Sequence, residues 1–120
     1  ASEASRLVKF TEKKLRGPPS ARSKPARYIR YLTSYAETFS DSMGELRTLL
    51  ARGDREEARR LTHSLRGTSG QVGVTGIQTL AAGLEESIRT GTEDTKILAQ
   101  AGIIEARLGI VCAAIRSMAG

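Results

Sequence analysis

The sequence predicts an all-α protein, an antiparallel up-down four-helix bundle with an additional N-terminal helix or arm. Apolar residues recur at alternating spacings of three and four along most of the 120-residue chain, which is the period of one face of an α-helix. No stretch shows the apolar–polar alternation of a half-buried strand. Glycine and proline divide the chain into segments whose lengths suit helices joined by short loops.

The N-terminal 25 residues form the predicted arm. Residues 2–16 are weakly amphipathic through Leu7, Phe10 and Leu15, and Gly17-Pro18-Pro19 ends this segment because proline does not continue a helix. The following residues, 17–25, are rich in Pro, Ser and charge and indicate a linker. The predicted bundle domain therefore occupies residues 26–120.

Most of the positive charge belongs to this arm. Residues 1–30 contain nine Lys or Arg against two Glu, a net charge of +7, whereas residues 31–120 contain ten against eleven acids, a net charge of −1. A basic arm can attract nucleic acid. Since it has no interleaved aromatic residues, we expect a solubilising tail or linker and no contact with nucleic acid.

The second predicted helix spans residues 26–51. Its narrow apolar stripe, spaced 3, 4, 3, 4, 3, 4, consists of Ile29, Leu32, Ala36, Phe39, Met43, Leu46 and Leu50. The helix has a potential break or bend at Ser40-Asp41-Ser42, because Asp and Ser are favoured N-cap residues.

Three further helices are predicted at residues 54–72, 76–90 and 93–118. Gly53 suits the left-handed position after a helix, and the fourth helix ends at Gly91. Two capping boxes are predicted, at Asp54 with Glu57 and at Thr75 with Gln78, and Thr92 is expected to cap the last helix. The apolar stripes of these helices are Ala58, Leu61, Leu65 and Val72; Ile77, Leu80, Ala81, Leu84 and Ile88; and Ile97, Ala101, Ile104, Leu108, Val111, Ile115 and Met118.

The single histidine, His63, is predicted to point to solvent. It lies about 160° around the helix from the core position Leu65. Its neighbours one turn away are Arg59, Arg60, Arg66 and Gly67, and Gly70 lies on the same stripe. Glycine inside a helix costs roughly 0.5–1 kcal/mol relative to alanine, and clustered arginines repel, so this face is unfavourable for stability alone. An imidazole nucleophile, phosphate-pairing arginines and glycines that admit a partner would suit phosphoryl transfer.

The stretch ARRLTHSLRGTSGQVGVTGIQTLAAGLEESIRTG, residues 58–91, resembles the signature of histidine-containing phosphotransfer domains. That family shows AHxLKGxAxxLG, followed by LxxLxxxLE and a closing glycine. The matching residues here are Thr62-His63-Ser64-Leu65-Arg66-Gly67 and Gly70-Gln71-Val72-Gly73, with Leu80, Leu84, Glu85 and Gly91 in register. Arg66 replaces the usual Lys and keeps its charge, and Thr62 replaces the usual Ala. The resemblance covers roughly residues 26–118.

The resemblance implies a phosphocarrier module without a kinase site of its own. His63 would carry the phosphoryl group and Arg66 would stabilise its charge. Arg59, Arg60, Gly67, Gly70 and Gln71 would form the surface that a partner approaches. The partners would be receiver domains of response regulators, or the receiver and kinase domains of the same hybrid sensor kinase. The receiver would supply Mg²⁺, and this chain would hold no cofactor.

Other features limit the function classes. The lone Cys112 excludes an internal disulfide and is expected to be a small buried apolar residue. One histidine without a cysteine pair argues against a metal site, and no glycine-rich nucleotide loop is present. No signal peptide or membrane-length apolar run is evident, so we expect a cytoplasmic protein without membrane contact.

Two alternatives remain open at this point. One is a helical interaction module without phosphotransfer, for which His63 would be dispensable. The other is a nucleic-acid-binding protein that uses the basic arm, whose binding would depend on salt and be lost with residues 1–25.

Overall fold

The computed structural model describes Arg6 and residues 23–119. Within residues 23–119 the chain forms helices and no strand, so the all-helical prediction is confirmed for this part. The helices are α2 (Ser23–Phe39), α3 (Ser42–Ala51), α4 (Arg55–Gln71), α5 (Thr75–Arg89) and α6 (Asp94–Ala119). The predicted helix at residues 2–16 lies outside the described residues, apart from Arg6.

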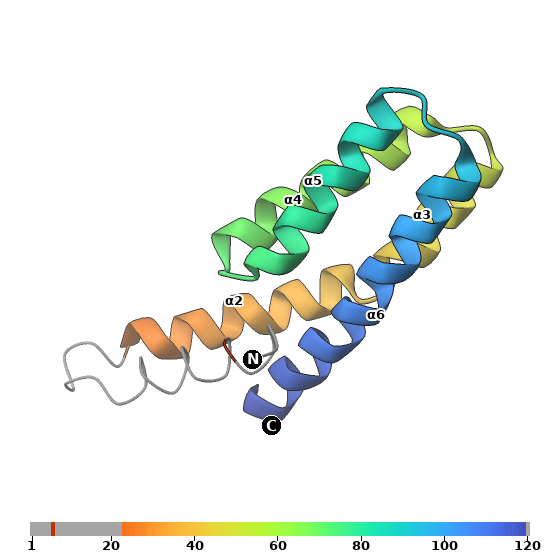
Figure 1. Cartoon of the computed structure of the whole chain (residues 1–120). Helices are drawn as coiled ribbons and strands as arrows, with labels where there is room; N and C mark the ends of the chain where they lie inside the picture. The colour runs from red at the N-terminus through yellow and green to blue at the C-terminus, as the bar shows by residue number, and fades with distance from the viewer. Residues whose placement is uncertain (1–5, 7–22, 120) are drawn as a thin grey trace.

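The helices form an elongated bundle (Figure 1). The helices α4 and α5 lie side by side and run in opposite directions, with the most extensive contact of any helix pair. The long helix α6 packs against α5 on one side and against α2 and α3 on the other. The site helix α4 thus lies across the bundle from α6.

The predicted second helix is divided into α2 and α3. It begins at Ser23, three residues earlier than predicted, because a proline in the first turn, here Pro25, removes an N–H that has no partner there anyway. The division falls at Ser40 and Asp41, within the predicted break. Ser42 donates a 2.7 Å hydrogen bond to the carbonyl of Phe39, whereas the side chain of Asp41 makes no capping bond.

In three of the loops between helices the second residue is a glycine with positive φ: Gly53 at 77°, Gly73 at 85° and Gly91 at 79°. At each loop the glycine N–H and the next N–H bond back to the preceding helix, as Gly53 does to Leu50 at 3.0 Å and Asp54 does to Leu49 at 2.9 Å. This paired bonding satisfies the last carbonyls of the helix and requires the left-handed conformation that glycine adopts without strain.

Only one of the predicted caps forms. The carboxylate of Asp54 accepts a hydrogen bond from the Glu57 N–H at 3.2 Å. The prediction for Thr75 is wrong, because α5 already begins at Thr75 and the apolar Val74 occupies the cap position. The tight loop at Gly73 leaves no further residue for a polar cap. The prediction for Thr92 is also wrong, since α6 begins at Asp94 and Glu93 precedes it directly.

The side chain of Arg55 links the start of α4 to the loop between α5 and α6 through hydrogen bonds. Its guanidinium donates to the carboxylate of Asp94 at 2.7 Å and to the carbonyl of Thr92 at 2.9 Å. A further bond of 3.3 Å reaches the carbonyl of Ile88 in the last turn of α5. A cation at the C-terminal end of a helix, here that of α5, is also favoured by the helix dipole.

The core is mainly aliphatic, as the apolar stripes predict, with Tyr35 and Phe39 as its aromatic members. Of the predicted core positions in α4, α5 and α6, all are buried except Leu61, Leu80 and Met118, which are partly buried and pack against the core. The thiol of Cys112 is buried, and burial raises its pKa. Three polar residues that the stripes did not include are also buried, namely Ser42, Thr62 and Ser69.

The buried polar groups of α4 have partners. The hydroxyl of Thr62 donates to the carbonyl of Ala58 at 2.8 Å. The hydroxyls of Ser69 and Tyr35 share a 2.7 Å hydrogen bond that links α4 to α2, and Tyr28 donates to the carbonyl of Val72 at 2.8 Å. These bonds fix the position of α4, and so of His63, relative to α2.

The expectation that no segment has the length and composition of a membrane span is wrong for α6. This helix is 26 residues long with a mean hydropathy of 1.6 over its most apolar window. One third of that window is buried inside the bundle, and the core helix of a soluble protein can have the same length and composition. The high hydropathy arises because α6 is apolar on its outer face as well as on its core face.

Candidate functional site

His63 lies in the middle of α4, and its side chain is 58% exposed. The neighbouring Thr62 and the following Leu65 are fully buried, so their burial turns the histidine outward from the bundle. The predicted solvent exposure of His63 is therefore confirmed.

The imidazole contacts a carboxylate on the neighbouring helix. Nδ1 of His63 lies 2.8 Å from Oε2 of Glu85 on α5. The Glu85 side chain is only 13% exposed, although His63 itself faces solvent. The antiparallel packing of α4 and α5 thus supplies the histidine with a nearly buried acidic partner.

This contact determines which ring nitrogen is free. A carboxylate only accepts hydrogen bonds, so Nδ1 must carry a proton to donate to Glu85. The guanidinium of Arg66, 3.2 Å from the same Nδ1, can only donate and would require the other tautomer. That tautomer would place a nitrogen lone pair against a carboxylate oxygen at 2.8 Å. We therefore assign the proton to Nδ1, which leaves the lone pair of the neutral ring on Nε2.

Two arginines share Glu85 with His63. Nε of Arg66 lies 3.2 Å from Oε1 of Glu85, and the Arg59 guanidinium lies 3.9 Å from Oε2. The contact between Arg66 and Glu85 is close enough for an ion pair, but its geometry is not that of a hydrogen bond. Arg66 thus lies beside both the imidazole and its carboxylate.

The arginines of the preceding turn are held by acids of their own helix. Arg59 bonds to Glu56 at 2.8 Å, and Arg60 bonds to Glu57 at 2.7 Å. The Arg59 bond lowers the pKa of the Glu56 carboxyl. The predicted strip of arginines around His63 is thus reduced to Arg59 and Arg66, because Arg60 turns toward the first turn of α4.

The two helical glycines have different surroundings. A Cβ added to the exposed Gly67 would meet nothing within 4 Å, so this position leaves open space beside the imidazole. A Cβ added to Gly70 would lie 2.5 Å from Nε2 and 2.9 Å from Cδ of Gln78. Glycine at position 70 therefore makes room for the Gln78 side chain of α5. The sequence had instead predicted that this glycine lets a partner protein approach.

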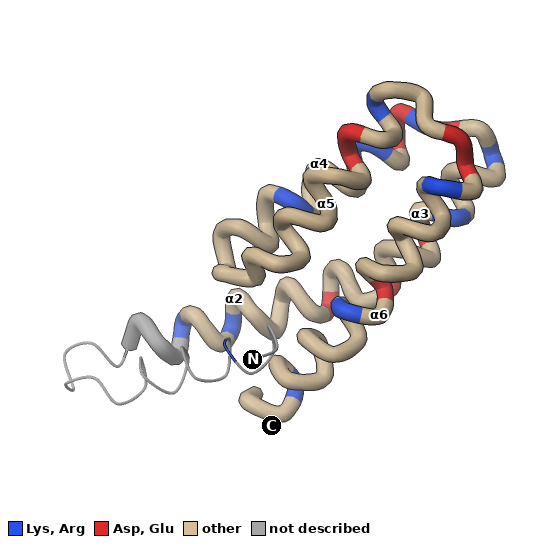
Figure 2. The backbone as a smooth tube through the Cα atoms, viewed as in Figure 1, with Lys and Arg blue, Asp and Glu red and all other residues tan. Residues whose placement is uncertain are grey.

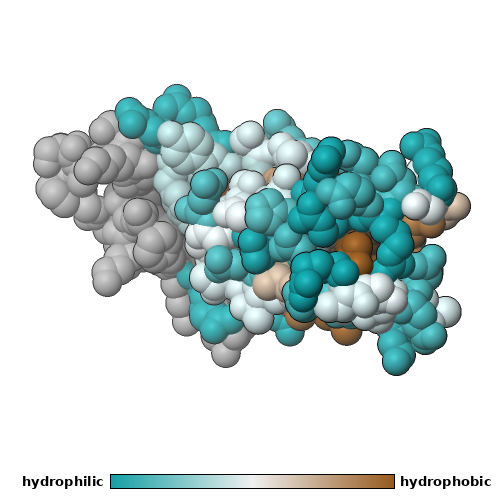
Figure 3. Space-filling view, turned by 90° about the horizontal axis from the view of Figure 1, so that it is seen from above, coloured by the Kyte–Doolittle hydropathy of each residue, from teal (hydrophilic) through white to brown (hydrophobic). Residues whose placement is uncertain are grey.

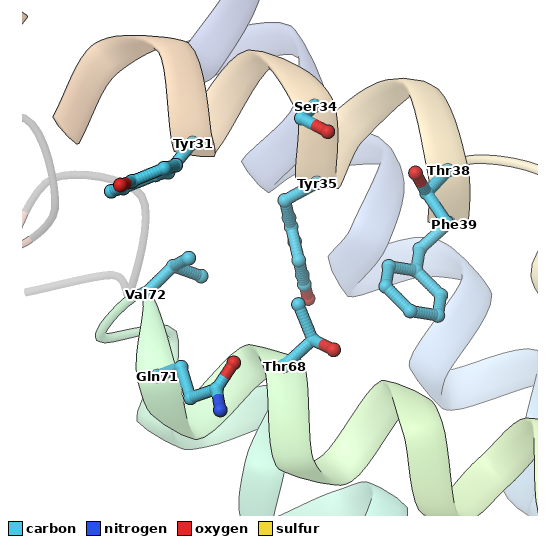
Figure 4. A pocket seen from close by; sticks show the side chains of 8 residues that line it. All are labelled: Tyr31, Ser34, Tyr35, Thr38, Phe39, Thr68, Gln71 and Val72. Atoms are coloured by element: carbon cyan, nitrogen blue, oxygen red, sulfur yellow. The ribbon is translucent and has the colours of Figure 1, made fainter. Parts of the chain in front are cut away.

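A groove of about 460 Å³ lies farther along the same helix, between α2 and α4 (Figure 4). Tyr35 and Phe39 extend into it from α2, and Gln71 lies on the α4 side. The remaining lining residues are Tyr31, Ser34, Thr38, Thr68 and Val72. Gln71, predicted as a contact residue, is thus exposed at the edge of this groove.

Many of the charged residues of the bundle lie at the end where α4 and α6 begin (Figure 2). They include acids, yet no group of three or more His, Cys, Asp or Glu side chains suited to a metal ion occurs in residues 23–119 or Arg6. The face in Figure 3 is largely hydrophilic, with small separate hydrophobic areas.

Glu85 was not predicted as a site residue, although the sequence contained a signal for it. His63 and Glu85 each lie eleven positions from Val74 in the loop between α4 and α5. Residues equally distant from the loop of an antiparallel helix pair lie opposite each other. Gly70 and Gln78, each four positions from Val74, are in contact for the same reason.

The fold and the site together define a helical bundle that presents one exposed, carboxylate-oriented histidine to solvent. Residues 30–117 match the family model of the Hpt domain. Since the match covers most of the 120 residues, the chain belongs to the Hpt domain family, whose members are histidine phosphocarriers of phosphorelays and not kinases. No curated protein and no solved structure matches the chain.

Proposed function

We propose that His63 accepts a phosphoryl group from an aspartyl phosphate of a receiver domain and passes it to the aspartate of a response regulator. The observation that carries this proposal is the 2.8 Å contact between Nδ1 of His63 and Glu85. It holds an exposed imidazole in the tautomer whose free lone pair, on Nε2, faces away from the carboxylate.

In the proposed step, the Nε2 lone pair attacks the phosphorus of the aspartyl phosphate. The new N–P bond forms as the P–O bond to the aspartate breaks, and its electron pair leaves with the carboxylate. The ring becomes positively charged while Nδ1 keeps its proton, and Glu85 stabilises that charge. Phosphoryl transfer depends mainly on positioning and charge stabilisation, which Glu85 and Arg66 provide here.

We propose that Arg66, which contacts the ring at Nδ1, supplies positive charge that stabilises the transferred group. Its guanidinium is 3.2 Å from the imidazole, and arginine pairs well with phosphoryl oxygens. The receiver domain would contribute its acidic pocket and Mg²⁺. We propose that this receiver approaches over Gly67 and covers the groove beside Gln71.

We propose that this module acts in the cytoplasm. Its proposed partners, a receiver domain or the receiver and kinase domains of a hybrid sensor kinase, would be present there. We infer no contact with nucleic acid or membrane for the transfer reaction. Since transfer between histidine and aspartate is reversible, the proposed module serves flow in both directions.

The experiment incubates the full chain with a panel of ³²P-labelled receiver domains and follows the label. We expect acid-labile label on the chain from at least one receiver, and none on His63→Gln. Thr95→Gln, a polar change on the exposed start of α6, is the control and should accept label like the parent. Label that persists on His63→Gln, or a folded parent that accepts none from any receiver, would refute the proposal.

A further inference from the structure

The outer face of α6 exposes a row of apolar side chains. Within the described residues, the large exposed hydrophobic side chains are those of Tyr31, Leu98, Ile103 and Ile110, and all but Tyr31 lie on α6. Ile103 is 54% exposed and Ile110 is 59% exposed. Figure 2 shows that few charged residues interrupt this helix. Contiguous exposed apolar surface on a soluble domain marks an interaction site.

The exposed row has the spacing of a coiled-coil seam. It consists of Ala99, Ile103, Ala106, Ile110 and Ala113, with spacings of 4, 3, 4 and 3. This second stripe runs along the side of α6 opposite the buried one, which begins at Ile97 and Ala101. The buried stripe makes the contacts of α6 with the other helices of the bundle. The outer stripe can therefore be covered only by a partner outside the bundle.

Small residues beside the row would allow a close approach. Gly102 and Gly109 lie along one edge of the row, and an added Cβ at either would meet nothing within 4 Å. Alanine and glycine at such positions let two helix backbones pack closely, while the isoleucines fill the remaining space. The face therefore fits another helix better than it fits an irregular surface.

We propose that two copies of this chain form an antiparallel homodimer through the outer faces of their α6 helices. In the register that we infer, Ile103 packs against Ala106 of the second copy, and Ile110 packs against Ala99 of the second copy. Each large side chain then meets a small one. A two-fold axis makes the contacts reciprocal, as in a closed symmetric dimer.

The polar residues at the edges of the row agree with this register. Arg107 on one edge lies opposite Gln100 of the second copy, so no like charges meet. On the other edge Gly102 lies opposite Gly109 of the second copy, where the backbones approach. Other antiparallel registers centred near Arg107 would place the two arginines against each other.

Other occupants of this face are less favourable. The basic residues 1–22 contain six Lys or Arg against two Glu, and the edges of the α6 row are themselves basic through Lys96, Arg107 and Arg116. Glu105 is the acid nearest the row, and its carboxylate is already bonded to Arg47 at 2.8 Å. A lipid surface would have to accept Arg107 near the middle of the row, at a cost in free energy.

The dimer would leave both histidines accessible. The α6 helix packs on α2, α3 and α5, and α4 lies across the bundle from it. Each copy would then present His63 on the side away from the dimer interface. The inference is thus independent of the proposed phosphotransfer, and either can fail without the other.

Sedimentation equilibrium of the full chain tests the association. We expect a mass that rises with concentration from 12.9 kDa for one chain toward twice that value. Ile110→Glu should weaken association more than about 10-fold, because it places an unpaired charge against Ala99 of the second copy. Leu98→Glu, an equally charged change on the same helix at an exposed position that is not part of the row, is the control and should dimerise like the parent.

Three results would overturn the proposal. The first is a parent chain that stays monomeric up to millimolar concentration, whether or not it also binds lipid vesicles. The second is an Ile110→Glu variant that associates as tightly as the parent. The third is a Leu98→Glu variant whose association is weakened as much as that of Ile110→Glu. Circular dichroism of each variant verifies that the bundle is folded, as expected for changes at exposed positions.

Cysteine pairing tests the direction. A mixture of Ala99→Cys and Ile110→Cys chains should form a mixed disulfide under mild oxidation, because the two positions face each other in the antiparallel register. In a parallel pair they would be about 16 Å apart along the helix. The native Cys112 is buried and should not react. An Ala99→Cys chain that pairs mainly with itself would refute the antiparallel arrangement.

Discussion

Nδ1 of His63 lies 2.8 Å from Oε2 of Glu85, across the interface of α4 and α5. The histidine is exposed while its carboxylate partner is 13% exposed, so the acid orients the ring without covering its far nitrogen. A second pair of groups, the guanidinium of Arg66 and the same carboxylate, lies 3.2 Å apart. The site therefore combines a fixed tautomer with positive charge, and each part can be tested separately.

Glu85 tests the assigned tautomer. In the parent, ¹⁵N spectra of the neutral ring should show the proton on Nδ1, and Glu85→Ala should shift it mainly to Nε2. Loss of a hydrogen bond to a charged group costs about 1.5–3 kcal/mol, so transfer should slow by roughly 10- to 100-fold. Glu85→Gln, whose amide oxygen can still accept the Nδ1 proton, should keep the parental tautomer. A parent ring protonated on Nε2 would contradict the assignment.

Arg66 tests the role of charge. We expect Arg66→Ala to slow transfer, and the difference from the parent should shrink as NaCl is raised, because salt screens exposed charges. Arg66→Lys keeps the positive charge and should retain most of the rate. Transfer rates measured across a salt series separate the two variants. Equal loss in Ala and Lys variants at every salt concentration would indicate that the shape of the guanidinium matters and its charge does not.

The helices could be predicted from the sequence because a single physical signal, the 3–4 spacing of apolar residues, sets both the period and the buried face. The ends of the helices followed from Gly53 and Gly91, where the chain needs a positive φ. Thr75 and Thr92 were wrongly predicted as caps. The residue that precedes a helix depends on the length of the loop, and that length is set by the backbone hydrogen bonds at the end of the preceding helix.

The site could be predicted in part. His63 was predicted to face outward from its position relative to Leu65, which depends on α4 alone. The contact with Glu85 depends on the register between two helices, and the space at Gly70 depends on Gln78 of α5. The burial of Ser69 was not predicted for a related reason, because its hydrogen-bond partner in the core, Tyr35, belongs to a second helix.

The hydrogen bond between Tyr35 and Ser69 should stabilise the bundle. Each of Tyr35→Phe and Ser69→Ala removes one partner of this 2.7 Å bond and should lower the free energy of unfolding by about 0.5–1.5 kcal/mol. The double variant should lose less than the sum of the single losses, because the second change removes no further hydrogen bond between them. Urea denaturation measures all four proteins, and strictly additive losses would show that the two hydroxyls are not coupled.

The ion pair between Arg47 and Glu105 should stabilise the packing of α3 on α6 in a pH-dependent way. The hydrogen bond from Arg47 lowers the pKa of the Glu105 carboxyl below its ordinary value. The pair therefore stabilises the fold above that ordinary value, and its effect is lost as the pH falls through the lowered pKa. Arg47→Ala should melt below the parent at pH 7, and the difference should diminish in acid. A difference in melting temperature that grows toward acid would contradict this sign.

Gly70 tests the packing reason given for this glycine. Gly70→Ala would bring a Cβ to 2.5 Å from the Gln78 side chain, which must then move. We expect the gain in helix propensity, up to about 1 kcal/mol, to be offset in the parent background. In a Gln78→Ala background the same change should stabilise the bundle. Thermal melts of the four proteins test this, and an equal gain in both backgrounds would exclude a role for Gln78.

Gly67 tests access to His63 most directly. It lies one helical turn beyond the histidine and about 40° around the axis, and a Cβ there would meet nothing within 4 Å. Gly67→Ala should raise the free energy of unfolding by at most about 1 kcal/mol, and Gly67→Gln should fold as well, because the position is exposed. Both changes should slow transfer, and Gln should slow it much more, because in-line attack requires close approach of His63 to a receiver aspartate. Measuring the melting temperature and the transfer rate of the same preparation separates access from stability. A Gly67→Gln variant that melts at or above the parent and transfers phosphate at the parental rate would show that the open space beside the imidazole has no part in the reaction.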